Sequence, residues 1–124
     1  MDTGHRDEAG RGPLCLAPVI ARVWTARATS PNAAAYREHF ECDVIPSVRG
    51  VEGYAGGSLL IFDRSEVAEV IVITRWCSLD AIRGFAGEDI DVAVVADAAR
   101  RLLLSWDERV RHYTVAVDDR IDPN

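Results

Sequence analysis

Four stretches of the sequence are dense in apolar residues, and β-branched or aromatic side chains are frequent in each. They span 19–24, 58–62, 67–76 and 110–117, and this composition predicts β-strands. Polar turn residues at 63–66 separate the second stretch from the third. These two stretches therefore predict a β-hairpin.

A first helix is predicted over 32–48, because apolar side chains recur there every four residues. They are Tyr36, Phe40, Val44 and Val48. Ser30 is the expected N-cap because it is followed by Pro31, which suits the first helical turn. Pro46 has no N–H to donate, so it should bend or end this helix.

The rest of the chain predicts a turn and further helix. The glycine-rich residues 50–57 precede a strand, which favours a turn over a dinucleotide-binding loop. Ser78 can cap a short helix that ends by Gly87, and 93–104 predicts another helix with Asp97 as a possible cap.

The order of these elements is β-α-β-β-α-β, which predicts a ferredoxin-like α+β fold with an antiparallel sheet. Helices cover one face of such a sheet, so its strands should be apolar on that face only. Residues 59–62 and 70–73 are instead apolar at every position. The other face should therefore also be buried, and a second copy of the chain is the simplest cover. The sequence predicts a homodimer packed sheet to sheet.

A chain of 124 residues has the length of one ordinary domain. Residues 1–17 mix charges with glycine and proline without periodicity, which predicts a loosely ordered leader. The single α+β domain is expected over 18–118 and a polar tail over 119–124. No apolar run reaches the roughly 20 residues of a membrane helix, and no apolar signal core is present near the start. No membrane partner is expected.

Composition excludes several classes of function. The 14 basic residues are all arginine, which excludes Schiff-base chemistry on a lysine and lysine-dependent phosphate loops. Twenty acidic residues give a net charge of −6 without an arginine cluster, so nucleic acid is not an expected partner. The number of cysteines is odd, and they are widely spaced at Cys15, Cys42 and Cys77. They predict reduced thiols and a cytoplasmic location.

Several segments resemble the antibiotic biosynthesis monooxygenase family. The most family-like piece is Trp76 followed, after one residue, by Ser78 at the end of the third strand. The other matching segments are 20–24, 36–40, 75–82, 85–89 and 107–113. The resemblance implies a dimeric α+β barrel with one pocket per subunit, between the sheet and its helices.

Members of this family oxidise polyaromatic phenols with O2 and without a cofactor, and others degrade haem. Relatives with the same fold are cyclases, isomerases or dehydratases of polyketide-like substrates. The haem-degrading branch has a catalytic tryptophan where this chain has Phe85, and an iron-binding histidine near Val94. It also has an asparagine on the first strand, where this chain has Arg22 and Trp24. No cofactor is therefore expected.

Two histidines are the candidate general bases, because imidazole titrates near neutral pH. His39 lies on the first predicted helix, where Asp43 is four residues away and could orient it. His112 lies on the last predicted strand. The alternative for each is a surface or packing role. Arg22 interrupts an apolar strand, where burial is costly without a partner, so it is the candidate to stabilise a substrate anion or to pair with Glu69.

The aromatic residues predict a pocket for a flat substrate, with core packing as the alternative. The candidate substrate-binding residues are six aromatics and one arginine: Trp24, Tyr36, Phe40, Arg75, Trp76, Phe85 and Trp106. A metal site needs three or four converging ligands, and the sequence has no pattern that supplies them, so no metal is expected.

The leading hypothesis is a cofactor-free monooxygenase of secondary metabolism that acts on a polycyclic or polyketide-type phenol. His39 or His112 would remove a proton and Arg22 would stabilise the anion, while the use of O2 is implied by the resemblance alone. One alternative is a cyclase, isomerase or dehydratase that does not use O2. The other is a non-catalytic dimer that binds a small ligand.

Overall fold

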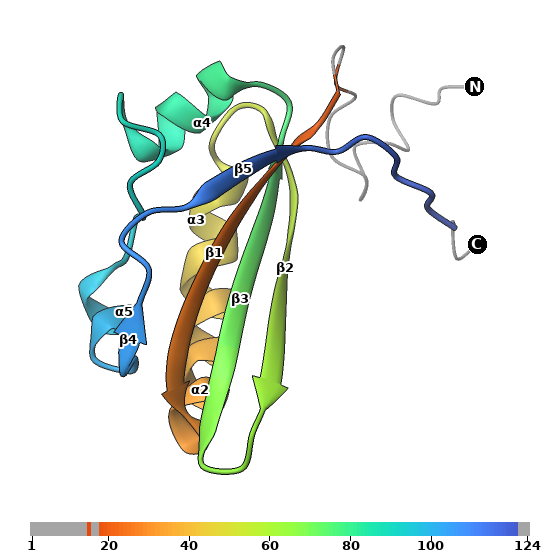
Figure 1. Cartoon of the computed structure of the whole chain (residues 1–124). Helices are drawn as coiled ribbons and strands as arrows, with labels where there is room; N and C mark the ends of the chain where they lie inside the picture. Colours follow the sequence, from red (N-terminus) through yellow and green to blue (C-terminus); the bar gives the residue numbers. More distant parts are fainter. Residues whose placement is uncertain (1–14, 16–17, 122–124) are drawn as a thin grey trace.

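The computed structural model describes residue 15 and residues 18–121 (Figure 1). The leader predicted over 1–17 lies outside the described residues, apart from Cys15, and so does the end of the predicted tail. Among the described residues, no helix is long and apolar enough to cross a membrane.

The elements follow the predicted order, with one additional short strand. They are β1 (Ile20–Thr29), α2 (Ser30–His39), the π-helical segment η1 (Phe40–Val44), α3 (Ile45–Arg49), β2 (Tyr54–Asp63), β3 (Val67–Trp76), α4 (Leu79–Ala86), α5 (Asp97–Arg100), β4 (Ser105–Trp106) and β5 (Arg111–Thr114).

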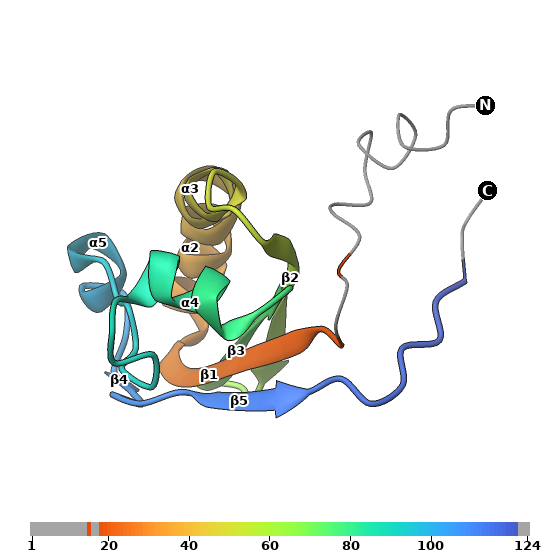
Figure 2. The same cartoon turned by 90° about the horizontal axis from the view of Figure 1, so that it is seen from above.

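The strands form one antiparallel sheet in the order β2-β3-β1-β4, with β5 also paired to β1. Helices α2, α3 and α4 all lie on the same side of β1, β3 and β2 (Figure 2). This is the ferredoxin-like α+β fold, and the prediction of the fold class is confirmed.

Alternation along the strands decides which side chains meet the helices. On β1, Trp24, Ala26 and Ala28 are buried, and on β3 Ala68 and Val70 are buried opposite them. Small residues on the sheet leave room for larger side chains of the helix, above all Tyr36 and Phe40, which are each 4% exposed. The core therefore lies between the sheet and the first helical run.

The first helical run, formed by α2, η1 and α3, begins at Ser30, two residues before the predicted range, and is not broken by its proline. Thr29, not Ser30, is the N-cap, and its side chain accepts a hydrogen bond from the backbone N–H of Asn32. Ser30 instead donates to Asp63 and to the carbonyl of Ser65. The chain then widens into the π turn of η1 just before Pro46. A wider turn accommodates a residue that cannot donate to the preceding turn.

The helix predicted over 93–104 is wrong except at α5. The N–H of Ala93 donates to the carbonyl of Glu108, and Val92 forms an isolated bridge with Arg109. Val92 and Ala93 are therefore paired with the chain that leads into β5, and these long-range contacts outweigh helix propensity at the start of the predicted helix. The glycine-rich turn was likewise predicted too long, because β2 begins at Tyr54 with a bulge before Gly56.

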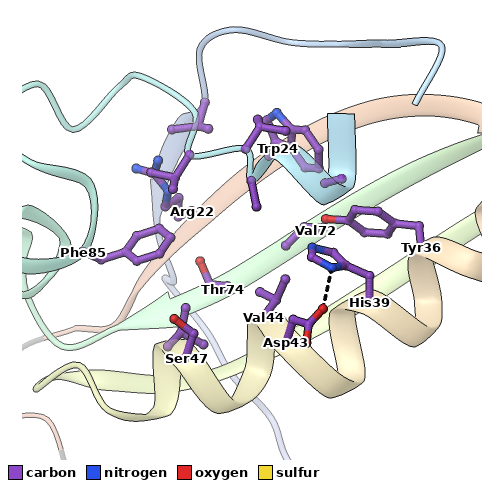
Figure 3. A pocket seen from close by; sticks show the side chains of 16 residues that line it. Arg22, Trp24, Tyr36, His39, Asp43, Val44, Ser47, Val72, Thr74 and Phe85 are labelled. Carbon is purple, nitrogen blue, oxygen red and sulfur yellow. Dashed lines mark hydrogen bonds and ion pairs between the residues drawn. The ribbon is translucent and has the colours of Figure 1, made fainter. Parts of the chain in front are cut away.

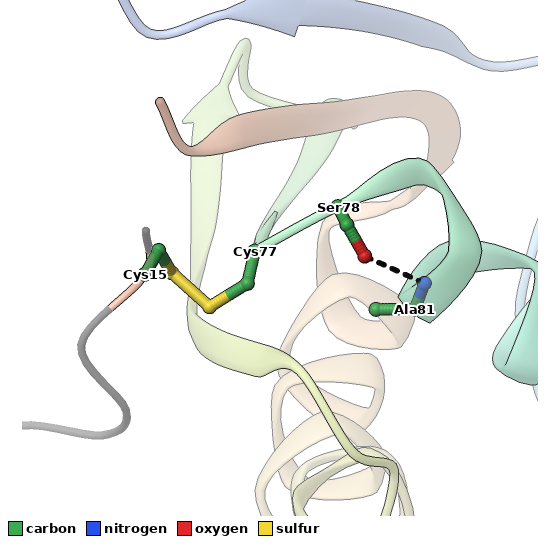
Figure 4. Close-up of a disulfide and its surroundings, with 4 residues drawn as sticks. All are labelled: Cys15, Cys77, Ser78 and Ala81. Carbon is green, nitrogen blue, oxygen red and sulfur yellow. Dashed lines mark hydrogen bonds between the residues drawn. A yellow bond between two sulfur atoms is a disulfide. The ribbon is translucent and has the colours of Figure 1, made fainter. Parts of the chain in front are cut away.

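A disulfide joins Cys15 to Cys77 (Figure 4), whereas Cys42 is free and exposed. The prediction of reduced thiols is therefore wrong for Cys15 and Cys77. Spacing could not reveal this pair, since the two residues are 62 positions apart. Disulfides persist in oxidising compartments, so the cysteines no longer support a cytoplasmic location.

We expect protein expressed in an oxidising compartment and purified without reductant to show one reactive thiol per chain in denaturant, and three after reduction. Removing the crosslink by Cys15→Ser or Cys77→Ser should lower the free energy of unfolding by about 2–4 kcal/mol, because the crosslink restricts the unfolded chain. Cys42→Ser is the matched control and should leave stability unchanged. Three reactive thiols before reduction would contradict the pairing.

Candidate functional site

A cavity of about 190 Å³ lies between the inner face of the sheet and the helices. Its wall includes β1 and β3, the helical run of α2, η1 and α3, the helix α4 and the segment before α5 (Figure 3). The lining residues are Arg22, Trp24, Tyr36, His39, Asp43, Val44, Ser47, Val48, Val72, Thr74, Phe85, Val94, Val95, Ala96, Ala99 and Val110. The cavity is smaller than the roughly 300–1,000 Å³ of most ligand sites, which favours a small and flat occupant.

Arg22 is the charged residue of this wall that is most deeply buried, at 5% exposure. It stands in a row across the sheet, with Thr74 of β3 on one side and His112 of β5 on the other. Its Nη1 donates to the carbonyl of Ile90 at 2.5 Å, and its Nη2 donates to the carbonyl of Val92 at 2.9 Å. The predicted alternative partner, Glu69, lies opposite Arg27 instead.

The guanidinium of Arg22 is also covered by an aromatic ring. Its Cζ lies 5.5 Å from the centroid of Phe85, and the other neighbour of that ring is Trp76, with centroids 5.4 Å apart. Burial lowers the pKa of Arg22 to about 10, with Asp91 acting in the opposite direction. Arg22 therefore remains a cation at neutral pH, in a place of low polarity where its charge acts strongly on an anion.

His112 does not line the cavity, but its imidazole contacts the guanidinium of Arg22. Its Nε2 lies 3.1 Å from Nη1 of Arg22, and its Nδ1 lies 3.3 Å from the carboxylate of Asp91. An arginine can only donate, so Nε2 accepts and the ring is neutral with its proton on Nδ1. Burial lowers the pKa of His112, the charge of Arg22 lowers it further, and Asp91 opposes both. Nε2, the nitrogen that would take the proton if His112 acted as a base, therefore already accepts a hydrogen bond from Arg22.

His39 lines the cavity together with Asp43, as the helical spacing predicted. Nδ1 of His39 lies 3.0 Å from Oδ2 of Asp43, which leaves Nε2 on the far edge of the ring (Figure 3). The imidazole is only 9% exposed, whereas the carboxylate is 65% exposed. A carboxylate in this position favours the tautomer with a free Nε2 and stabilises the imidazolium that forms when Nε2 takes a proton.

Trp24 and Tyr36 form an aromatic wall near His39. Their ring centroids are 6.3 Å apart, and those of Tyr36 and His39 are 5.6 Å apart. The indole N–H of Trp24 is held by the carbonyl of Asp107. Burial raises the pKa of Tyr36 to about 12, so this hydroxyl stays protonated and can donate a hydrogen bond but not act as the base.

Four other predicted binding residues do not line the cavity. Phe40 and Trp76 are buried in the core, at 4% and 0% exposure. Arg75 points to the other face, near Ser58, and Trp106 borders a separate polar hollow on that side of the sheet. Core packing, the alternative weighed for the aromatics, describes Phe40 and Trp76.

Thr74, Ser47 and the segment 94–96 belong to the cavity wall but were not predicted. Alternation from Trp76 would have found Thr74, since residues two apart on a strand share a face. Thr74 is buried and accepts a hydrogen bond from the indole N–H of Trp76. The segment 94–96 could not be found, because it was assigned to a helix. Among the described residues, which are 15 and 18–121, no cluster of three side chains that could bind a metal occurs.

No family model matches the sequence, and no curated protein matches it significantly. Several solved structures share the fold, including these two. One, from Bacillus cereus, is described as a candidate antibiotic biosynthesis monooxygenase; it has a TM-score of 0.60 and 19% identity and covers 85% of this chain and 100% of its own. The other is the monooxygenase of the gene ActVA-Orf6 of Streptomyces coelicolor in complex with nanaomycin D, with a TM-score of 0.51, 16% identity and coverage of 86% and 93%. At these identities the likeness shows the fold alone, which is the fold that the family resemblance implied.

The lowered pKa of His112 makes stability depend on pH. Below about pH 6.5 the unfolded chain binds a proton at this site that the folded chain excludes. The free energy of unfolding should therefore fall as the pH drops from about 6.5 through the lower folded pKa, by at most about 1.4 kcal/mol per pH unit. His112→Gln keeps an acceptor for Arg22 and should remove this component, as measured by urea unfolding at pH 5 to 8. Parallel curves for the two proteins would contradict it.

Proposed function

We propose that this protein is a cofactor-free monooxygenase whose substrate is a small fused-ring phenol, or the keto form of one. The observation that carries the proposal is the arrangement of one cavity. A histidine–carboxylate pair stands on its helical side, and a buried arginine stands on its sheet side. Aromatic and aliphatic side chains fill the wall between them. The fold shared with the two solved structures supports the same class of chemistry.

The substrate would lie flat among the aromatic side chains, with its oxygen toward Arg22. Phe85 lies at one end of the cavity and Tyr36 at the other (Figure 3), and flat aromatic faces favour stacked or edge contacts with a planar ligand. The guanidinium stabilises the phenolate or enolate by its charge, in a site from which most water is excluded. Only an anion gains fully from that charge, so Arg22 favours the deprotonated substrate.

Nε2 of His39 would then remove the proton, and Asp43 would stabilise the resulting imidazolium. The substrate anion is electron-rich at carbon and passes one electron to O2, which gives a substrate radical and superoxide. These combine at carbon to form a peroxide, which takes the proton back and loses water to leave a carbonyl. One oxygen atom stays in the product and the other leaves as water, so the electrons balance without a flavin or a metal.

The protein would act as a homodimer. Leu59 and Val72 pack on the core, so Leu60 and Phe62 of β2 lie on the other face, with Ile71 of β3 paired to Leu60. Leu60 is 44% exposed and Phe62 is 58% exposed. Helices cover the opposite side of the sheet (Figure 2). An apolar sheet face of this kind is typical of a protein interface, and a second copy of the chain is the cover we propose.

Anthrone is a suitable first substrate, because its enol is a fused-ring phenol and its oxidation by O2 gives anthraquinone and water. We expect catalysed formation of anthraquinone in air and none under argon, measured by liquid chromatography and mass spectrometry. His39→Gln should lower kcat by about 10²–10⁴-fold, the usual contribution of a general base. Asp43→Asn keeps the hydrogen bond to His39 but loses the charge, so its loss should be smaller.

Glu41→Gln is the matched control for Asp43→Asn. Glu41 is an exposed carboxylate on the same π turn, close to Arg37 rather than to His39. Turnover that is equally fast under argon, with a product isomeric with the substrate, would assign the protein to the cyclases or isomerases. Binding without turnover across anthrones and naphthols, unchanged by His39→Gln, would assign it to the non-catalytic binders.

We expect Leu60→Glu with Phe62→Glu to convert a dimer into a folded monomer, because the two charges would be buried without partners at the interface. Light scattering coupled to size-exclusion chromatography measures the mass. Leu79→Glu is the control, since Leu79 is 41% exposed but begins α4 on the helical side of the sheet. A wild-type monomer at high protein concentration would overturn this proposal.

A further inference from the structure

A closed ring of interactions surrounds the buried guanidinium of Arg22. The carbonyls of Ile90 and Val92 accept from Nη1 and Nη2, and the carboxylate of the residue between them, Asp91, lies 3.3 Å from Nδ1 of His112. His112 in turn accepts from Nη1 and so closes the ring. Three consecutive residues of one loop thus contact both Arg22 and the histidine that holds it.

We infer that Asp91 and His112 are positioning residues that fix the direction of Arg22 and hold the 90–96 segment in place as a wall of the cavity. The inference rests on the proposed role of Arg22 as the anion-binding group. It assigns His112 to the support of that group and adds Asp91, whose side chain is outside the cavity lining.

Both backbone polar groups of Asp91 form hydrogen bonds that fix its position. Its carbonyl accepts from the N–H of Val110, just before β5, at 2.8 Å. Its own N–H donates to the side chain of Asp89. The chain continues from Val92 directly into residues 94–96, which line the cavity. A displacement of Asp91 would therefore move the cavity wall and the partners of Arg22 together.

The interactions of this ring also determine which N–H groups of Arg22 remain free to bind a ligand. A guanidinium has five N–H groups in one plane. The two on Nη1 go to Ile90 and His112, and one on Nη2 goes to Val92. Within the described residues, Nε–H and the second N–H of Nη2 have no hydrogen-bond partner. Arg22 can therefore present two donors to an occupant, which suits two neighbouring oxygen atoms or a single anionic one.

The ring requires a neutral His112. The charged groups that face this ring are Arg22 from β1 and Asp91 from the loop, whereas Arg111 and Tyr113 point to the opposite face of β5. Nearby Arg109 lies 3.8 Å from Asp89 on the surface. Protonation at Nε2 would place a donor against the donor of Arg22, so acid should open the ring.

Nuclear magnetic resonance of the full chain without ligand tests the inference. The ring nitrogens of His112 should show a proton on Nδ1 near pH 7. The Nε–H signal of Arg22, assigned by its loss in Arg22→Lys, should be sharp, and it should broaden as His112 titrates. Asp91→Ala should broaden the same signal and raise amide exchange over 90–96 at least tenfold. Asp91→Asn keeps an acceptor and should restore most of the wild-type behaviour.

Glu88→Ala is the control, because it removes an exposed carboxylate from the same loop and should change none of these signals. A proton on Nε2 of His112 in the wild type would overturn the inference, and so would an Arg22 signal that is unaffected by both Asp91→Ala and the titration of His112. If Asp91→Ala does not fold, the wild-type tautomer and the acid titration still decide. None of these measurements needs turnover, so a failed oxygenase assay would leave the inference standing.

Discussion

Burial of one positive charge constrains much of this structure. A guanidinium that is removed from water must find hydrogen-bond acceptors inside the protein, because an unpaired buried charge would destabilise the fold by several kcal/mol. Arg22 finds them in two carbonyls of the 90–92 loop and in His112. Meeting that requirement fixes where the loop runs and how β5 joins β1. It also fixes the cavity wall that continues from the loop.

The remaining donors of Arg22 and the histidine–carboxylate pair occupy two sides of the same cavity, and the fold explains why. Side chains on the inner face of β1 point toward the helices, and Asp43 of the π turn η1 lies beside His39 in the middle of the helical run formed by α2, η1 and α3. Local widening of a helix often accompanies functional sites, because it redirects side chains without ending the helix. The pocket depends on two departures from regular structure, one in the helix and one in the loop.

Patterns that repeat within one element were predicted well from the sequence. The apolar, β-branched stretches predicted the strands β1, β2, β3 and β5, and four-residue spacing predicted that Asp43 could orient His39. The features that escaped prediction depend on distant parts of the chain. The carbonyls that bind Arg22 lie 68 and 70 positions away, and the start of the predicted second helix is instead paired with a distant segment by the hydrogen bond from Ala93 to the carbonyl of Glu108. The partner of Cys15 and the occupied nitrogen of His112 are also set by tertiary contacts, which local spacing does not encode.

The pairing of β1 has a consequence for the order in which the molecule can assemble during its synthesis. β1 is made first, yet it pairs with β3, β4 and β5, and the last of these ends at Thr114 of a 124-residue chain. The hairpin of β2 and β3 has local contacts and can form while translation continues, but the set of acceptors around Arg22 is complete only when His112 has been made. Contacts of such sequence separation slow folding. A nascent chain that stalls before residue 112 would therefore lack β5 and the histidine acceptor of Arg22, and one edge of β1 would be left without its partner strand. Such a chain would be a substrate for chaperones and proteases rather than a shorter working protein.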